Sequence, residues 1–63
     1  MTTIVLAHPN QHCPRFQVFG VYDSNDDRFT FAVQEFEDRD KAEQVARKLM
    51  ENHRADHFRR VLP

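Results

Sequence analysis

The chain has only one cysteine and one glycine among its 63 residues, and each scarcity excludes a class of protein. The lone cysteine, Cys13, has no partner for an intramolecular disulfide, which excludes a disulfide-stabilised scaffold and favours a reducing compartment. The single glycine, Gly20, excludes the glycine-rich loops that bind nucleotide phosphates. The fold must therefore be held by packing, and no cofactor is expected.

Long apolar runs are also missing. The longest one near the N-terminus covers residues 4–7, which is shorter than a signal-peptide core or a membrane span, and no basic residue precedes it. This pattern predicts a cytoplasmic protein that does not bind membranes.

The chain has no strong excess of charge of either sign. Its net charge is -1 with the histidines neutral, which argues against strong non-specific attraction to nucleic acids or anionic membranes. The distribution is uneven: residues 1–38 hold two basic and six acidic side chains, whereas residues 39–63 hold seven basic and four acidic ones. This asymmetry is compatible with a basic binding surface, with an electrostatic match between two copies, or with an ordinary solvated helix face, which is the simplest interpretation.

The residues that are present indicate a folded chain. Apolar residues make up 40% and charged residues 30% of the sequence. The length predicts one domain, residues 1–63, that buries only about 60% of the surface exposed by its unfolded form. A core this small usually needs further stabilisation, from very regular packing, a bound metal or oligomerisation.

Alternating apolar residues predict strands, and proline and turn residues separate them. Pro9 and Pro14 bracket a loop, because proline has no amide proton to donate to a neighbouring strand. Residues 23–27 are rich in Asp, Ser and Asn, which favour a hairpin turn, and Gly20 indicates a bulge or a close approach of another group. The predicted strands are residues 2–7, 15–22, 28–36 and 58–62.

An amphipathic helix is predicted between the third and fourth strands. It begins at Asp38 or Asp40, where Asp40 and Glu43 fit a capping box, and it ends within residues 52–54. Six residues at helical spacing form one apolar stripe: Ala42, Val45, Ala46, Leu49, Met50 and His53. The element order predicts an α+β fold (β-β-β-α-β), with a small antiparallel sheet of three to four strands and the helix packed on one face.

One short helix is too small to cover both faces of this sheet. Regular alternation in the third strand places Phe29, Phe31 and Val33 under the helix and Phe36 on the other face. The sheet then has more apolar surface than the helix covers. In an alternative arrangement, the first strand folds over the remaining apolar surface and covers it within the monomer.

The uncovered surface provides the main functional hypothesis. It is expected to contain Phe19, Val21 and Phe36, and contiguous exposed apolar patches usually mark contact sites. We therefore expect a non-enzymatic interaction module that binds a second copy of itself or another protein partner, either through this surface or through a strand edge.

A second hypothesis is a nucleic-acid-binding domain. Phosphate groups would be neutralised by basic residues of the helix and the C-terminal segment, and bases would stack on aromatic residues of the sheet. The basic candidates are Lys41, Arg47, Lys48, Arg54, Arg59 and Arg60. Core packing competes for the same aromatic residues, so this hypothesis ranks second.

No catalytic or metal-binding signature is present. His8 and His12, and likewise His53 and His57, are four residues apart, and the two pairs would bind one zinc ion only if the first strand ended near the end of the helix. Their spacing is not that of a typical zinc motif, so no metal is expected. Cys13 follows His12, but adjacent side chains seldom face each other, so no nucleophile is assigned. No motif indicates a particular family.

Overall fold

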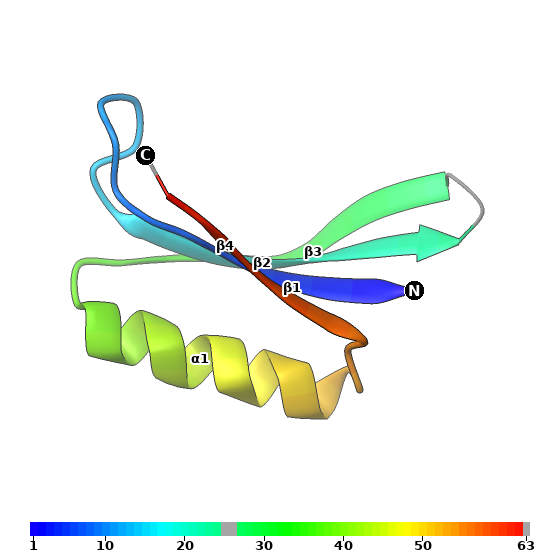
Figure 1. Ribbon diagram of the computed structural model, residues 1–63. Helices are drawn as coiled ribbons and strands as arrows, with labels where there is room; N and C mark the ends of the chain where they lie inside the picture. The colour runs from blue at the N-terminus through cyan, green and yellow to red at the C-terminus, as the bar shows by residue number, and fades with distance from the viewer. Residues whose placement is uncertain (25–26, 63) are drawn as a thin grey trace.

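The structure, a computed structural model, describes residues 1–24 and 27–62. The described residues form four strands and one helix in the predicted order, which confirms the α+β fold (Figure 1). The elements are β1 (Thr2–Ala7), β2 (Phe16–Ser24), β3 (Asp27–Phe36), α1 (Arg39–Asn52) and β4 (His57–Val61). The predicted turn at residues 23–27 includes residues 25 and 26, which lie outside the described residues.

The strands form one mixed sheet in the order β3-β2-β1-β4. β2 is antiparallel to both β1 and β3, whereas β4 is parallel to β1. The expectation of a purely antiparallel sheet is therefore wrong for β4. Since α1 carries the chain from β3 back across the sheet, β4 enters the opposite edge in the direction of β1, and such a crossover is the usual connection between parallel strands (Figure 1).

β1 lies inside the sheet, between β2 and β4. Ile4 and Leu6 point toward α1 and have no exposed surface, and Val18 of β2 is also completely buried beside them. Apolar and β-branched residues suit this inner position because β1 has a paired strand on each edge and α1 on one face. The alternative in which the first strand folds over the sheet is therefore excluded.

α1 begins after Asp38, the first of the two predicted starting points. The Asp38 side chain accepts a hydrogen bond from the backbone nitrogen of Asp40, with an Oδ1–N distance of 3.0 Å, and so caps the helix. The predicted capping box of Asp40 and Glu43 is not formed, because Glu43 binds Arg60 instead. Along the predicted stripe, the helix buries Ala42, Ala46 and Leu49 against the sheet. Within residues 1–24 and 27–62, no helix has the length and apolar character needed to cross a membrane.

β3 contains a β-bulge that interrupts its alternation. Val18 pairs with Gln34 and Gly20 pairs with Phe31, so two residues of β3, Ala32 and Val33, lie opposite the single residue Phe19 of β2. Ala32 has a φ of 54°, which is unusual for a residue with a side chain. One extra residue in a strand moves every later side chain to the opposite face.

The bulge corrects the predicted placement of two side chains. Phe31 packs against the core on the helix side as expected, but Phe36, beyond the bulge, also packs there. Val33 precedes helix-side Gln34, faces the other side of the sheet and is 58% exposed. The placement of Phe36 on the uncovered face and of Val33 in the core was therefore wrong, because it assumed unbroken alternation.

Gly20 permits the close approach that the sequence indicated. Its backbone lies under the ring of Phe31, where an added Cβ would come within 2.2 Å of the ring carbon Cζ. The ring of Phe31 is held on its other side by His53, with 4.2 Å between the ring centroids. The absence of a side chain at position 20 thus allows the aromatic ring to cover β2 and join the strands to the end of α1.

β4 is joined to α1 by an ion pair between Arg60 and Glu43. Both terminal nitrogens of Arg60 donate to the carboxylate, one of them to Oε2 at 2.8 Å. The hydrogen bond from the guanidinium lowers the pKa of Glu43 below its ordinary value of 4.5. Charge-assisted bidentate pairs of this kind are geometrically specific, and this one links α1 to β4, which backbone pairing with β1 holds in the sheet.

Removing the carboxylate of Glu43 is expected to have a pH-dependent effect. Because the pKa of Glu43 is lowered in the folded state, the ion pair stabilises the fold above pH 4.5, and this stabilisation is lost as the pH falls through the lowered pKa. We expect Glu43→Gln to lower the melting temperature at neutral pH by about 1–4 °C and to match the wild type in acid. Thermal unfolding followed by circular dichroism over a pH series, with Glu51→Gln as the control, measures this. A difference that does not vary with pH would contradict the assignment.

Candidate functional site

The sheet has one face that no helix or strand covers in the described part of the chain. α1 lies entirely on one side, and the opposite side, called the open face below, bears only the rising connection between β1 and β2 at one end (Figure 1). Strand register and alternation place the following residues on the open face: Thr3, Val5, Ala7, Gln17, Phe19, Val21, Thr30, Val33, Glu35, His57, Arg59 and Val61.

The middle of the open face is apolar. Val5 lies in register with Phe19 on one side and with Arg59 on the other, and it is only 6% exposed because these neighbours flank it. Phe19 and Val21 are half-buried. Toward the two edges of the sheet, Val33 and Val61 are exposed on 58% and 40% of their surface. The open face thus presents a contiguous apolar strip that runs across all four strands.

Two of the three interaction residues expected from the sequence, Phe19 and Val21, lie on this strip, and Phe36 does not. Sequence reasoning missed Val5 and Val33. Val5 was detectable, because it alternates with the core residues on either side of it in β1. Val33 was not, since only the bulge turns its side chain to the open face.

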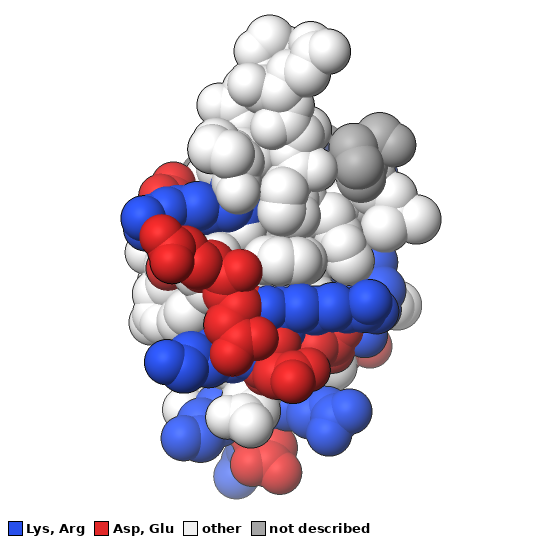
Figure 2. Space-filling model, turned by 90° about the vertical axis from the view of Figure 1, so that its left-hand side faces the viewer, with Lys and Arg blue, Asp and Glu red and all other residues white. Residues whose placement is uncertain are grey.

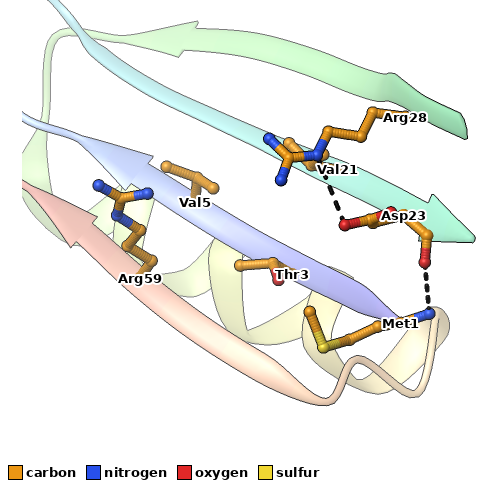
Figure 3. A pocket seen from close by; sticks show the side chains of 7 residues that line it. All are labelled: Met1, Thr3, Val5, Val21, Asp23, Arg28 and Arg59. Atoms are coloured by element: carbon orange, nitrogen blue, oxygen red, sulfur yellow. Dashed lines mark hydrogen bonds and ion pairs between the residues drawn. The ribbon is translucent and has the colours of Figure 1, made fainter. Parts of the chain in front are cut away.

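A shallow hollow of about 190 Å³ lies at one end of the open face. Arg28 and Arg59 reach toward it from β3 and β4, with Val5 and Val21 between them (Figure 3). The Nε atom of Arg28 lies 3.4 Å from Oδ2 of Asp23, so this guanidinium is already partly neutralised. Pockets that bind small molecules usually enclose about 300 Å³ or more, so this hollow is a depression in a contact surface rather than a substrate cavity.

Two charged side chains of the open face have no ion pair within residues 1–24 and 27–62. Arg59 projects from β4 beside the apolar strip, and Glu35 projects from β3 at the opposite edge of the sheet. Glu35 accepts a hydrogen bond from the neutral amide of Gln17, with an Nε2–Oε1 distance of 3.1 Å. The open face therefore carries one unpaired positive and one unpaired negative group at opposite edges.

The basic residues considered for nucleic-acid binding do not gather on one surface. Arg59 is on the open face, whereas Arg60 is on the helix side and is bound to Glu43. The remaining candidates, Lys41, Arg47, Lys48 and Arg54, are exposed on or just after α1. Seen from the end where α1 begins, lysine and arginine side chains alternate with acidic ones (Figure 2). This mixed surface does not form a continuous basic track for phosphates.

The two histidine pairs are separated by the length of β1. His57 is paired with Thr3 at the beginning of β1, whereas His8 follows its end and donates its backbone N–H to Val61 at 2.9 Å. The condition for a shared zinc site is therefore not met. Among the described residues, no group of three or more His, Cys, Asp or Glu side chains is placed to bind a metal ion.

Cys13 makes its hydrogen bonds within the loop between β1 and β2. Oδ1 of Asn10 accepts hydrogen bonds from the backbone nitrogens of His12 and Cys13, both at 2.8 Å, which shapes the loop between β1 and β2. The thiol of Cys13 donates to the backbone oxygen of Arg15 at 3.5 Å. The thiol thus donates to a backbone oxygen and not to a base that would activate it.

Comparison with known proteins yields no relative: no family model matches the chain, and no curated protein or solved structure is significantly similar to it. A functional proposal must therefore come from the open face itself.

Proposed function

We propose that this chain is a small, non-enzymatic interaction module that pairs with a second copy of itself through the open face. The observation that carries the proposal is the apolar strip formed by Val5, Phe19, Val21 and the exposed Val33 and Val61. Contiguous apolar surface of this kind, bordered by polar groups, is characteristic of protein contact sites.

The total surface of the chain supports association. Its accessible area is 4717 Å², whereas a folded monomer of 7.5 kDa is expected to expose about 4,250 Å². The chain therefore exposes roughly 470 Å² more than a compact monomer of its mass. Among the described residues, the larger side chains that are completely buried are Ile4, Leu6 and Val18, and a core this small would also gain stability from a second layer.

The strand edges are less suitable for pairing than the open face. The free edge of β3 is distorted by the bulge at Ala32 and Val33. At the other edge, β4 has only five residues and carries Arg59 and Arg60 in succession. Bulges, short length and positive charges are the features that protect an edge strand from adding another strand. The face is therefore the preferred contact in this proposal.

The proposal is compatible with a cytoplasmic location, because Cys13 is the only cysteine and no disulfide within the chain is needed for the fold. Nucleic-acid binding is not proposed, because the basic residues lie on different surfaces and no observation favours it over protein binding.

Val33→Lys is the sharpest test of the open face. Val33 is 58% exposed, so the folded monomer should tolerate the change, but an ammonium group within a buried apolar strip must lose its hydration without a partner. We expect the dissociation constant of the dimer to rise by about tenfold or more. Sedimentation equilibrium over a concentration series, from low to high micromolar, measures it.

Gln34→Lys is the matched control, because it adds the same charge to the next residue of β3 on the helix side. It should leave the dissociation constant unchanged. A wild-type protein that remains monomeric at high micromolar concentration would refute self-association. Equal weakening by both variants, or by neither, in a dimeric wild type would place the contact away from the open face.

A further inference from the structure

We infer that β4 binds an extended acidic segment of another protein, which adds to its free edge as a fifth strand. Apolar residues of this segment enter the groove between β4 and α1, and glutamate or aspartate residues alternate with them and face Arg59. The site is the edge of the sheet and not the apolar strip of the open face, so the inference goes beyond the proposed self-association.

The outer edge of β4 presents backbone groups that pair with no other strand in the described part of the chain. β4 is the last strand of the sheet, and its neighbour is β1. Successive residues of a strand direct their backbone groups to opposite edges, and the carbonyl of Val61 accepts a hydrogen bond from the backbone N–H of His8, on the β1 side. The N–H and C=O groups of Phe58 and Arg60 are therefore directed to the free edge, where an extended segment can bind them.

A groove of about 230 Å³ lies on the helix side of this edge, between α1 and β4. α1 packs mainly on β1 and β2, so every residue of β4 remains exposed. Met50 and the 37% exposed Phe58 supply the apolar lining of the groove. The guanidinium carbon of Arg60 lies 5.1 Å from the ring centroid of Phe58, and the ion pair with Glu43 holds it there. Residues of an added strand that lie beside Phe58 and Arg60 also point to the helix side, so apolar side chains at these positions enter the groove.

The charges around the edge favour an acidic segment. Arg59 projects on the open-face side without an ion pair within residues 1–24 and 27–62, whereas on the helix side Arg47 and Arg60 line the groove with a single carboxylate, that of Glu43. Positive charge protects an edge against strands of the same sign, including a second copy of β4. It does not oppose a strand whose carboxylates lie beside Arg59, and such a strand is attracted to this edge.

A labelled peptide of alternating residues, Glu-Val-Glu-Val-Glu-Val-Glu with blocked ends, tests the inference by fluorescence anisotropy. We expect Arg59→Glu to raise the dissociation constant of this peptide by about tenfold or more. Lys48→Glu is the matched control, because it makes the same change of charge at an exposed position of α1 that does not line the groove, and it should change the dissociation constant by less than about threefold. Absence of binding to the wild type, or equal weakening by both variants, would overturn the inference.

Methylation of the peptide backbone tests the addition of a strand directly. Only alternate N–H groups of an added strand face β4, so N-methylation of the valines or of the glutamates should abolish binding in one case and leave it largely intact in the other. Equal effects of the two methylated peptides would show that the peptide does not bind as a strand.

Val33→Lys separates this inference from the proposed self-association. Val33 lies on β3, at the opposite edge of the sheet, so this variant should bind the peptide of glutamate and valine to within about threefold of the wild type. Loss of peptide binding in Val33→Lys would place the peptide on the open face and refute the edge site. A monomeric wild type that binds the peptide refutes the self-association and supports the edge site.

Discussion

Leu6→Ala should leave a large fraction of the chain unfolded at room temperature. Leu6 has no exposed surface and packs with Ile4, Val18 and the alanines of α1 in the main core cluster. Replacing a buried leucine with alanine typically costs about 3–5 kcal/mol, because the lost transfer free energy is augmented by a cavity. A domain of 63 residues has a total stability of only about 3–9 kcal/mol, so this loss removes most of it.

Urea denaturation followed by circular dichroism measures this effect, at one fixed protein concentration because dimerisation would contribute to stability. Leu62→Ala is the matched control: the same atoms are removed from a side chain that is 68% exposed, so the unfolding midpoint should scarcely change. If the two variants lose similar amounts of unfolding free energy, Leu6 is not a core residue and the packing of α1 on β1 is wrong.

Gly20→Ala is expected to destabilise the fold by about 1–3 kcal/mol. An added Cβ would lie 2.2 Å from Cζ of Phe31, well inside contact distance. The ring also has two aromatic neighbours, Phe29 and His53, with centroid distances of 6.1 Å and 4.2 Å, so moving it disturbs these contacts. The substitution therefore forces either the ring or the strand out of place, although alanine is otherwise at least as suitable for a strand as glycine.

A double-mutant cycle with Phe31→Ala isolates this clash. In the Phe31→Ala background the space above Gly20 is empty, so Gly20→Ala should cost nothing or should stabilise the fold slightly. Urea denaturation of the four proteins gives the coupling free energy. If Gly20→Ala lowers the free energy of unfolding equally in both backgrounds, the ring of Phe31 does not lie over Gly20.

The elements themselves were predictable from local patterns. The strands at residues 2–7 and 28–36 were located to within one residue of β1 and β3, and α1 begins after one of the two predicted aspartates. Apolar residues alternate in a half-buried strand and recur about every 3.6 residues in an amphipathic helix, so the elements can be recognised from the sequence alone. The end of β2 was predicted at residue 22 and lies at Ser24, because backbone pairing with β3 extends the strand beyond its apolar pattern.

The candidate site was only partly predictable. Phe19 and Val21 follow from alternation in β2, and the structure places them on the open face. Phe36 and Val33 exchanged sides because Ala32 adopts a φ of 54° and adds one residue to β3 opposite Phe19. Gly20 indicated a bulge or a close approach, and the register shift lies beside it, but the sequence pattern does not show that the extra residue belongs to β3.

The sequence by itself determined the order of the elements, the apolar stripe of α1, and an apolar area larger than one helix can cover, because these depend on composition and on local periodicity. Only the tertiary structure decided that β4 runs parallel to β1, that β1 lies inside the sheet, and that Arg59 and Glu35 occupy opposite edges of the open face. Strand order and bulges arise from contacts between residues far apart in the chain. Strand order and bulges therefore cannot be predicted from the alternation of apolar residues within a single segment.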